Sequence, residues 1–291
     1  MKKELKTKII MLCRWMLNDK VYLKLVFRLL MNQKLNLKEP KTFNEKIQYL
    51  KLYDRKEIYP ILVDKYEVKD WVQNKIGSNY LIETLGIWNT FEEIDFESLP
   101  MQFVLKCTHD SGSVKIVKDK SKIDYNEFKE FFSSALKKNY FDIAREWAYK
   151  DIKPRIIAEK LLESEEEDLP DYKFHCFNGV VDSVMVCTER YTGTPKYYFF
   201  DEQWHLLKYN KLGIETEEPV NVEKPENIEK LFEIAKILSD NIPFVRVDLY
   251  YVKNQIYFGE MTFYPHSGFD RNLLTKTDLE WGRMITFEGE N

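Results

Sequence analysis

Two acidic side chains, Asp248 and Glu260, lie in a stretch that predicts a β-hairpin from Phe244 to Phe269. Apolar and polar residues alternate in its first half, and Lys253-Asn254-Gln255 supplies the turn. The acids lie six residues to either side of Asn254, so we expect them to face each other. Facing carboxylates repel unless a positive charge lies between them. Mg²⁺, bound by one or two carboxylates and by phosphates, would supply that charge. The hairpin alone equally allows both acids to point into solvent.

A second group of residues, 103–117, could bind phosphate. A short apolar strand ends at Lys106-Cys107, a polar loop with one glycine spans 108–113, and a second apolar stretch begins at Val114. Successive backbone N–H groups in such a loop bind anions, and Lys106 adds a positive charge. The loop lacks the GK[ST] ending that precedes a helix in Walker motifs. The sequence therefore indicates a phosphate clamp of another kind.

Helices and strands that would position these groups occur in blocks along the chain. Two helices are expected over 4–31 with a break near Asn18-Asp19, and Thr42 with Glu45 predicts the start of a third. Further helices are expected over 62–76, 125–149 and 225–238. Strands are expected over 103–107, 114–117, 156–162, 171–177, 181–188 and 197–200, with an Asn178-Gly179 hairpin turn. This order predicts the α+β class, with a cleft of ATP size between two sheets.

Composition limits the class of protein. Aromatic residues make up 15% of the 291 residues, which favours sheets and cleft walls over a helical bundle. The four cysteines form no CxxC pair and have no histidine at zinc spacing, so reduced thiols and a cytoplasmic location are expected. The longest early apolar run, Ile9 to Cys13, is far shorter than the roughly 20 residues of a membrane span, and no signal peptide is visible.

The beginning of the chain is basic although the whole chain has a net charge of −4. Residues 1–51 carry 13 Lys/Arg against 4 Asp/Glu, and apolar side chains such as Trp15 and Phe27 are interleaved with them. Such a segment could lie on an anionic membrane surface, at the inner face of the membrane. Two ordinary helices that pack on the core, with their charges in solvent, are the preferred interpretation.

Six segments together resemble the ATP-grasp superfamily, and most closely its TupA-like branch, which is associated with polysaccharide and teichuronopeptide biosynthesis. They are KTFNEKIQYLKLYDR (41–55), VDKYEVKDWV (63–72), FVLKCTHDSGS (103–113), IKPRIIAEKLL (152–162), DYKFHCFNG (171–179) and the hairpin 244–269. The resemblance implies a helical N-terminal region over 1–60 and an ATP-grasp domain over 61–291. Within that domain, about 100–160 would form a lid that clamps the nucleotide, and 161–291 a subdomain that carries the carboxylates and the metal.

The resemblance, which extends to D-alanine–D-alanine ligases, also implies roles for single residues. Lys65 and Lys106 would bind the phosphates of ATP, and Ser111, Gly112 and Ser113 of the loop from Asp110 would cover them. Glu159, with the backbone of Lys160 and Leu161, would recognise adenine, and Asp171 the ribose. The pair Asp248 and Glu260 would bind Mg²⁺, with Arg246 beside the transferred or attacked group.

One position departs from the pattern of the family. The usual Glu-x-Asn is Glu260-Met261-Thr262 here, and a threonine hydroxyl binds Mg²⁺ more weakly than an amide oxygen, so the second metal position is in doubt. Arg190 and Lys196 are candidates for nucleotide phosphates or an anionic substrate, and equally for exposed charges at strand ends. His266 is a candidate proton acceptor, and His109 a candidate phosphate contact.

The resemblance implies an ATP- and Mg²⁺-dependent carboxylate–amine ligase that acts through an acyl phosphate. It would join an amino acid or another small amine to the carboxylate of a sugar, for example a uronic acid, or of a polysaccharide precursor. No nucleic-acid partner is expected. A kinase that phosphorylates a sugar or small molecule, and a non-enzymatic membrane-associated assembly protein, remain alternatives. Glycosyl transfer is disfavoured because no DxD motif follows a predicted strand.

Overall fold

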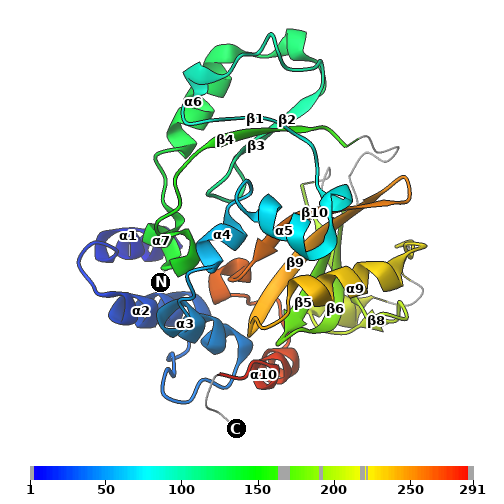
Figure 1. The fold of residues 1–291 in the computed structure, drawn as a ribbon. Helices are drawn as coiled ribbons and strands as arrows, with labels where there is room; N and C mark the ends of the chain where they lie inside the picture. Colours follow the sequence, from blue (N-terminus) through cyan, green and yellow to red (C-terminus); the bar gives the residue numbers. More distant parts are fainter. Residues whose placement is uncertain (1–2, 163–170, 190–192, 217–219, 221, 288–291) are drawn as a thin grey trace.

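The computed structural model describes residues 3–162, 171–189, 193–216, 220 and 222–287. Arg190 and most of the acidic loop after Leu162 lie outside these ranges. Two antiparallel sheets, one above the other in Figure 1, each have helices packed against them. The lower sheet carries the larger core.

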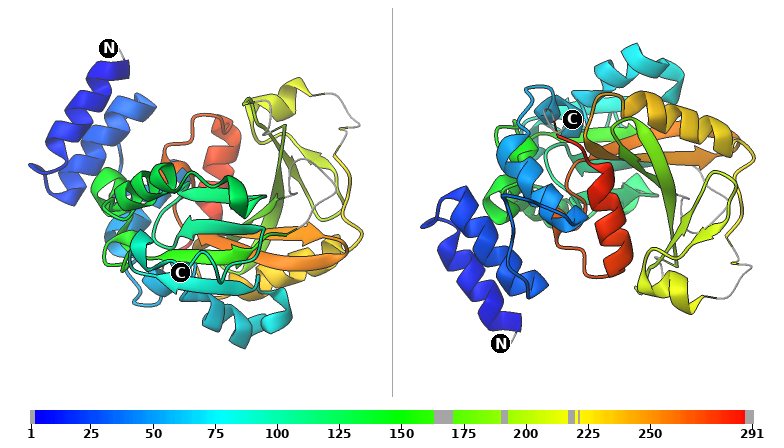
Figure 2. Two further views of the ribbon diagram at one scale, coloured as in Figure 1. Left: turned by 90° about the horizontal axis from the view of Figure 1, so that it is seen from above. Right: turned by 90° about the horizontal axis from the view of Figure 1, so that it is seen from below.

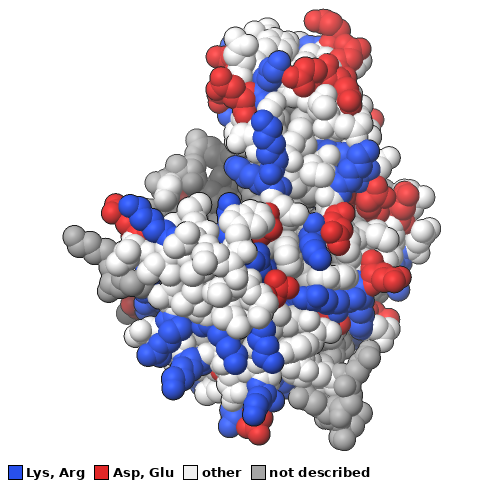
Figure 3. Space-filling view, turned by 90° about the vertical axis from the view of Figure 1, so that its left-hand side faces the viewer, with Lys and Arg blue, Asp and Glu red and all other residues white. Residues whose placement is uncertain are grey.

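Two antiparallel helices, α1 (Lys3–Cys13) and α2 (Asp19–Met31), begin the chain and lie at one edge of the molecule (Figure 2). The predicted break is confirmed, because the Asn18 side chain accepts a hydrogen bond from the Val21 N–H and caps α2. The inner side of α2 is buried against α3 and the residues that follow the last strand. In Figure 3, which views the molecule from the side of α1, Lys and Arg side chains border a broad uncharged surface.

The third helix, α3 (Phe43–Tyr53), begins at the predicted capping box of Thr42 and Glu45. It packs against α10 (Thr275–Met284), where a Cβ on Gly282 would lie 2.1 Å from the Lys41 carbonyl oxygen. Segments from the first and last thirds of the chain therefore pack directly against each other.

The helix predicted over 62–76 is two helices, α4 (Tyr59–Val63) and α5 (Val68–Ile76). The chain breaks at Asp64, whose carboxylate accepts hydrogen bonds from the N–H groups of Tyr66 and Glu67. A side chain that binds nearby backbone N–H groups competes with helix continuation, and this local turn was not recognised in the sequence.

The small sheet has the order β1-β4-β2-β3. Its strands are β1 (Thr84–Trp88), β2 (Phe103–Cys107), β3 (Val114–Val117) and β4 (Ile156–Lys160). The sheet thus includes a strand that precedes the predicted lid range of 100–160. Phe103, Leu105 and Phe132 are the centre of its core, under α6 (Tyr125–Ala135).

The single helix predicted over 125–149 is likewise interrupted. After α6, a second short helix, α7 (Tyr140–Ala144), ends at Arg145, which adopts a left-handed φ of 56°. Asn139 caps α7 by accepting a hydrogen bond from the Phe141 N–H. The described 3₁₀ turns are Ser78–Tyr80, Phe91–Glu93, Lys120–Lys122, Trp147–Tyr149 and Pro265–Gly268.

The large sheet has the order β10-β9-β5-β6-β7-β8. Its strands are β5 (Asp171–Phe177), β6 (Val180–Thr188), β7 (Lys196–Phe200), β8 (Leu206–Leu207), β9 (Phe244–Val252) and β10 (Gln255–Thr262). The helix α9 (Ile228–Leu238) covers one face, where Phe174, Val247 and Leu231 are fully buried. The short α8 (Lys211–Glu215) follows β8. The opposite face carries the polar residues of the candidate site.

Candidate active site

The hairpin β9–β10 brings the two predicted metal ligands together. Its register pairs Glu260 with Asp248, so the prediction that these acids face each other is confirmed. The two-residue turn alone would pair Asp248 with Gly259, and Glu260 would then point to the other face. A bulge between Phe258 and Glu260 shifts the register by one residue. Both carboxylates consequently lie on one face of the sheet.

Gly259 lies within this bulge and is closely surrounded. A Cβ at this position would be 3.0 Å from the Asp248 carbonyl oxygen and 3.1 Å from the Tyr250 ring. Both distances are shorter than ordinary van der Waals contact. The absence of a side chain at Gly259 therefore allows the backbone to bring Glu260 opposite Asp248.

Asp248 is almost fully buried and is held by two cations. The Arg246 guanidinium donates hydrogen bonds to both carboxylate oxygens, at 2.6 and 2.7 Å, and the Lys173 ammonium donates another. Lys173 also lies 2.5 Å from the Asp171 carboxylate. Burial lowers the pKa of Lys173, but the charge of Asp248 outweighs this effect and raises it above its ordinary value. Positive and negative side chains therefore alternate along this face of the large sheet.

Glu260 and Thr262 complete this row. The Arg246 guanidinium lies 3.5 Å from the Glu260 carboxylate and 3.1 Å from the Thr262 hydroxyl, which donates a hydrogen bond to Glu260 at 3.2 Å. Burial raises the pKa of Glu260, but the charges of Lys65 and Arg246 outweigh burial and lower it. Glu260 is therefore an ionised carboxylate at neutral pH, as a hard metal ion requires.

Lys65 connects this face with the predicted phosphate loop. Its ammonium donates a hydrogen bond to the Asp110 carbonyl oxygen, and its backbone N–H donates to the Thr108 carbonyl oxygen at 3.1 Å. The Asp64 carboxylate accepts hydrogen bonds from the Thr108 hydroxyl and the Arg155 guanidinium, both at 3.1 Å. Asp64 and Arg155 thus fix Lys65 beside the loop.

The loop 108–113 presents Ser111 and Gly112 outward. Both residues are exposed, Gly112 has a φ of 94°, and no other atom lies within 4 Å of where its Cβ would be. Ser113 instead donates a hydrogen bond to the Asp110 carboxylate, and the Tyr140 hydroxyl donates to the Ser111 carbonyl oxygen at 2.7 Å. His109 points away, with its ring 3.3 Å from the Ala135 carbonyl oxygen in the core below α6. The prediction that His109 contacts a phosphate is therefore wrong.

Glu159 and Lys106 meet on the face of the small sheet. The buried Glu159 carboxylate lies 2.6 Å from the Lys106 ammonium and 2.5 Å from that of Lys69 on α5. Burial raises the pKa of Glu159, but the two lysines outweigh this effect and lower it. Lys69 also donates hydrogen bonds to the Ile82 carbonyl and Thr84 hydroxyl oxygens. A second cation therefore stands beside Lys106.

A cavity of about 210 Å³ lies between the phosphate loop and the hairpin. Arg246, Glu260 and His266 line it, together with Ser111, Tyr140, Glu146, Tyr149, Thr262, Tyr264, Pro265 and Ser267. Glu146 is buried, and burial raises its pKa although Lys51 opposes the shift. The cavity is thus lined by two carboxyl groups, those of Glu146 and Glu260, whose pKa values are shifted in opposite directions.

The short segment 266–268 forms one wall of this cavity in an unusual conformation. His266, Ser267 and Gly268 have consecutive left-handed φ values of 49°, 53° and 63°. The Gln48 amide donates to the Ser267 and Gly268 carbonyl oxygens at 3.0 and 2.8 Å, and Lys51 donates to Ser267 at 2.7 Å. Left-handed non-glycine residues persist where the surroundings enforce them. Helix α3 therefore holds the backbone that carries His266.

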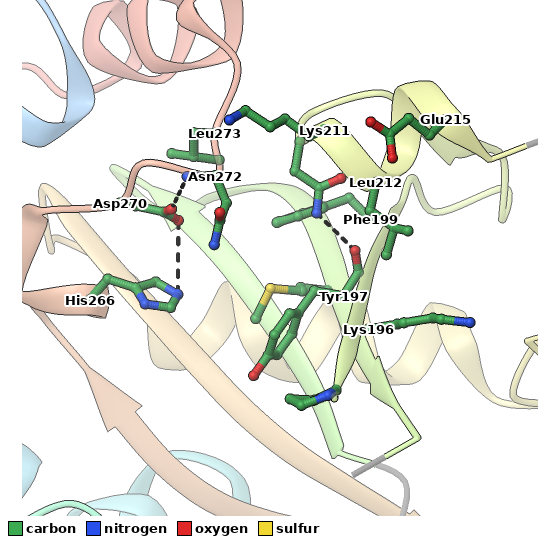
Figure 4. Close-up of a pocket in the computed structure, with 13 residues that line it drawn as sticks. Lys196, Tyr197, Phe199, Lys211, Leu212, Glu215, His266, Asp270, Asn272 and Leu273 are labelled. Atoms are coloured by element: carbon green, nitrogen blue, oxygen red, sulfur yellow. Dashed lines mark hydrogen bonds and ion pairs between the residues drawn. The ribbon is translucent and has the colours of Figure 1, made fainter. Parts of the chain in front are cut away.

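Beyond His266 lies a second cavity of about 340 Å³ (Figure 4). Strand β7, α8 and the segment after β10 form its walls. The residues that line it are Met185, Pro195, Lys196, Tyr197, Phe199, Asn210, Lys211, Leu212, Glu215, His266, Asp270, Asn272 and Leu273. His266 therefore belongs to both cavities, and its ring lies 3.8 Å from the Asp270 carboxylate.

Comparisons with known proteins agree with this architecture. The sequence model of a family described as TupA-like ATPgrasp matches residues 45–286. The chain belongs to the TupA-like ATP-grasp family. It is thus an enzyme of the ATP-grasp class, whose cofactor is ATP, and the predicted ATP-grasp fold is confirmed. A search of curated protein sequences found no match.

Solved ATP-grasp structures resemble the chain at low identity. D-alanine–D-alanine ligase from Helicobacter pylori is 16% identical, with a TM-score of 0.47 over 84% of this chain and 67% of that chain. The same enzyme from Bacillus anthracis, complexed with ATP, is 16% identical, with a TM-score of 0.44 over 77% and 63%. The biotin carboxylase domain of Hydrogenobacter thermophilus 2-oxoglutarate carboxylase is 13% identical, with a TM-score of 0.46 over 86% and 52%.

Some of the predicted ATP-grasp residues lie elsewhere than around this opening. Lys160 is exposed, and its N–H donates to the Glu83 carbonyl oxygen at 3.0 Å, while Leu161 follows the end of β4. Lys196 pairs with Glu189 at 2.8 Å and lines the second cavity. The structure therefore does not bring Lys196 to the carboxylate pair. Arg190 lies outside the described residues.

Three residues of this candidate site were not identified in the sequence. Lys69 and Lys173 each neutralise a buried carboxylate, and Glu146 lines the first cavity. Lys173 follows Asp171 by two residues, the spacing that places both on one face of a strand, and this was the available signal. The partner of Lys69 lies 90 residues away at Glu159, so the sequence offered no local signal for it.

Proposed function

We propose that this protein is an ATP- and Mg²⁺-dependent carboxylate–amine ligase. The observation that carries the proposal is that Arg246 and Glu260 line one cavity with Ser111 of the loop 108–113. Asp248 adjoins this cavity through its hydrogen bond with Arg246, and Lys65 is bonded to Asp110 of the loop. Positive side chains beside the phosphates and carboxylates that can bind Mg²⁺ are what the transfer of a phosphoryl group requires. Membership of an ATP-grasp family supports the same conclusion.

The donor atoms of the hairpin fit Mg²⁺. In the part of the chain that the structure describes, no group of three or more His, Cys, Asp or Glu side chains is arranged for a metal ion. Two carboxylates and a hydroxyl, from Asp248, Glu260 and Thr262, nevertheless suffice when phosphates supply the other ligands. A bound Mg²⁺ would neutralise charge on the phosphates. Its charge would also neutralise part of the Asp248 carboxylate charge that Arg246 and Lys173 neutralise in this structure.

The chain's own residues then have distinct tasks. Lys65, Lys106 and the loop N–H groups would bind the phosphates, while Arg246 would orient the substrate carboxylate. An oxygen of that carboxylate attacks the γ-phosphorus, which forms an acyl phosphate and releases ADP. The amine then attacks the acyl carbon, phosphate leaves, and the amine loses a proton. Arg246 would stabilise the oxyanion formed in this second step.

The second cavity is a suitable place for the amine-bearing substrate. It lies on the same sheet face as Arg246, because Met185 is paired with Lys173, which in turn is paired with Asp248. His266 stands between the two cavities and would accept the proton of the amine. The Asp270 carboxylate at 3.8 Å would stabilise the resulting imidazolium.

The lining of this cavity also suits a small polar compound. Tyr197, Phe199 and Leu273 provide apolar walls, and Asn272 and Asp270 point into the opening (Figure 4). A cavity of about 340 Å³ is within the range of small-molecule sites. An amino acid or a small amino compound would fit there, with a uronic acid or another carboxylate-bearing precursor of a cell-surface polysaccharide as its partner.

The location that we propose is the cytoplasm, where ATP is available. All four cysteines are free, and three of them are buried. This arrangement agrees with a compartment that keeps thiols reduced. No helix among the described residues is long and apolar enough to cross a membrane.

The test is the release of ADP and phosphate by the purified protein with Mg²⁺ and ATP. We expect release only when both an amine and a carboxylate are present, for example glycine or lysine with glucuronic or galacturonic acid. The control is the variant Glu260→Gln, which should bind ATP weakly and release no ADP. A stable phosphorylated sugar formed without amine would identify a kinase instead. Failure to bind ATP in calorimetry at millimolar Mg²⁺ would refute the proposal.

A further inference from the structure

Helix α1 carries apolar side chains on both of its sides, although four of its 11 residues are charged. Ile10, Cys13 and Leu17 pack inward against α2. On the outer side of α1, the exposed fractions of the residues are 50% for Leu5, 58% for Met11 and 68% for Leu12. In the connection that follows, they are 69% for Trp15 and 74% for Met16. Large apolar residues that follow one another in solvent in this way leave an uncovered apolar surface.

These side chains are concentrated in one place. Among the described residues, 16 large apolar side chains are exposed, and six of them fall between Leu5 and Val21. Single exposed apolar residues are normal, whereas a group on one surface marks an interaction site. The group lies outside residues 45–286, which the family model matches. Neither the proposed ligase site nor the family accounts for it.

The surroundings of this group are basic. Lys8, Lys20, Lys24 and Arg28 are exposed, and the Arg14 guanidinium lies 4.9 Å from the centre of the Trp15 ring. Residues 4–31 contain six Lys/Arg and two Asp/Glu. One of these acids, Asp19, is already paired with Arg145 at 3.0 Å and Arg55 at 3.4 Å. In Figure 3, Lys and Arg side chains accordingly gather along one side of a broad uncharged surface.

Helix α2 attaches this surface firmly to the rest of the protein. Tyr22, Leu23 and Phe27 are at most 1% exposed, and the Phe27 ring lies 6.1 Å from that of Phe269. For α2, the interpretation as an ordinary packed helix is thus correct. Trp15 belongs to the connection between the helices instead, and it is turned away from the core. The outer side of α1 is consequently presented on a rigid support.

We propose that this surface, formed by the outer side of α1 and the connection 14–17, binds to an anionic lipid bilayer. Met, Leu and Trp side chains would enter the boundary between headgroups and acyl chains, and the surrounding Lys and Arg would contact lipid phosphates. A second copy of the chain would fit less well, because two positive surfaces would face each other. The inference is independent of the ligase activity, since it rests on other residues.

The test is co-sedimentation of the full chain with phospholipid vesicles in the absence of ATP. Vesicles of phosphatidylcholine with roughly a quarter phosphatidylglycerol should bind the protein, and phosphatidylcholine alone should bind it far less. Binding should weaken as salt increases, because the charge attraction is screened. Equal binding to both kinds of vesicle, or to neither, would overturn the proposal.

Two variants separate the apolar and the basic contributions. The triple change Leu12→Ser, Trp15→Ser and Met16→Ser should abolish sedimentation with either vesicle. The triple change Lys8→Gln, Lys20→Gln and Lys24→Gln should weaken binding to anionic vesicles about 100-fold, at roughly fivefold for each charge. All six substituted side chains are exposed, so the melting temperature of both variants should equal that of the unchanged protein.

A matched control uses exposed apolar residues elsewhere. The variant Ile116→Ser with Ile214→Ser changes side chains that are 60% and 54% exposed, far from α1 in the sequence. It should bind anionic vesicles like the unchanged protein. If it loses binding as strongly as the α1 variant, general surface hydrophobicity explains the result and the proposal is wrong. A dimer that the α1 variant dissociates, without vesicle binding by the unchanged protein, would identify a second copy as the occupant.

Discussion

Exchanging each member of the carboxylate pair for its amide should separate catalysis from stability. Glu260 is 34% exposed at its side chain, and its carboxylate lies 3.5 Å from the Arg246 guanidinium. A partly exposed pair at this distance contributes about 1 kcal/mol or less to folding. Glu260→Gln should therefore lower the melting temperature by no more than about 2–4 °C. Its ADP release should nevertheless be abolished, because the carboxylate that we propose as a Mg²⁺ ligand is lost.

Asp248→Asn should behave differently. The side chain of Asp248 is 3% exposed and binds Arg246 through both oxygens at 2.6 and 2.7 Å, with Lys173 as a further partner. Removing one charge from such a buried group leaves the cations uncompensated and costs about 3–5 kcal/mol. This variant should lose both activity and stability, so its inactivity alone would not identify a metal ligand.

The assay is ADP release as a function of Mg²⁺ concentration, with thermal unfolding of the same samples. Calorimetric titration with ATP, at low and high Mg²⁺, reports whether the metal still supports nucleotide binding. The reasoning is refuted if Glu260→Gln keeps the activity and the Mg²⁺ dependence of the unchanged protein. It is also refuted if Glu260→Gln unfolds as readily as Asp248→Asn, since the structure gives the two side chains unequal partners.

Three further changes test other parts of the site. Gly259→Ala should reduce ADP release, with ATP binding retained, because its Cβ would lie 3.0 Å from the Asp248 carbonyl oxygen and would push aside the backbone that positions Asp248; unchanged activity would contradict the importance of the bulge. Thr262→Asn should lower, several-fold, the Mg²⁺ concentration needed for half-maximal ADP release, and a higher requirement would contradict its assignment as a ligand. The pKa of Glu159 is below its ordinary value of 4.5, so its stabilising contribution is complete above that pH and is lost as the pH falls through its lowered pKa. The difference in melting temperature between the unchanged protein and Glu159→Gln should therefore be largest at neutral pH and shrink below about pH 4; a constant difference would show that the charge is not involved.

The hairpin shows both the strength and the limit of prediction from sequence. Counting residues from Asn254 correctly placed Glu260 opposite Asp248. The structural reason is different, however, because the turn consists of Lys253 and Asn254 and the bulge at Gly259 restores the pairing. Hydrophobic alternation fixes which residues can share a face, but a bulge depends on local backbone crowding that alternation does not report.

Local signals were sufficient for several elements. The Thr42–Glu45 capping box, the Asn178-Gly179 turn and the break before Asp19 all depend on neighbouring residues, and all three are confirmed. The interrupted helices were missed where a side chain such as Asp64 binds both its own backbone and distant groups. Residue type and periodicity within one segment do not reveal a partner on another sheet.

The charge partners were the least predictable part of the site. Glu159 was recognised as important, yet its neutralisation by Lys69 and Lys106 depends on how α5 packs beside the small sheet. Lys173 was overlooked because an isolated lysine in a strand usually points into solvent. Here it is 14% exposed at its side chain, between two carboxylates. Tertiary packing therefore decided which of the many lysines belong to the site.

The left-handed segment 266–268 adds a link between the N-terminal helices and the wall of the candidate site. Helix α3 fixes it through Gln48 and Lys51, and the following residue, Phe269, packs against Phe27 of α2. A protein shortened to residues 45–286 would keep every residue that the family model matches. It would nevertheless lose the aromatic neighbour of Phe269 and the capped start of α3. If the proposed function holds, mutations that loosen the N-terminal helices should consequently alter which amine is used, even when the outer side of α1 is unchanged.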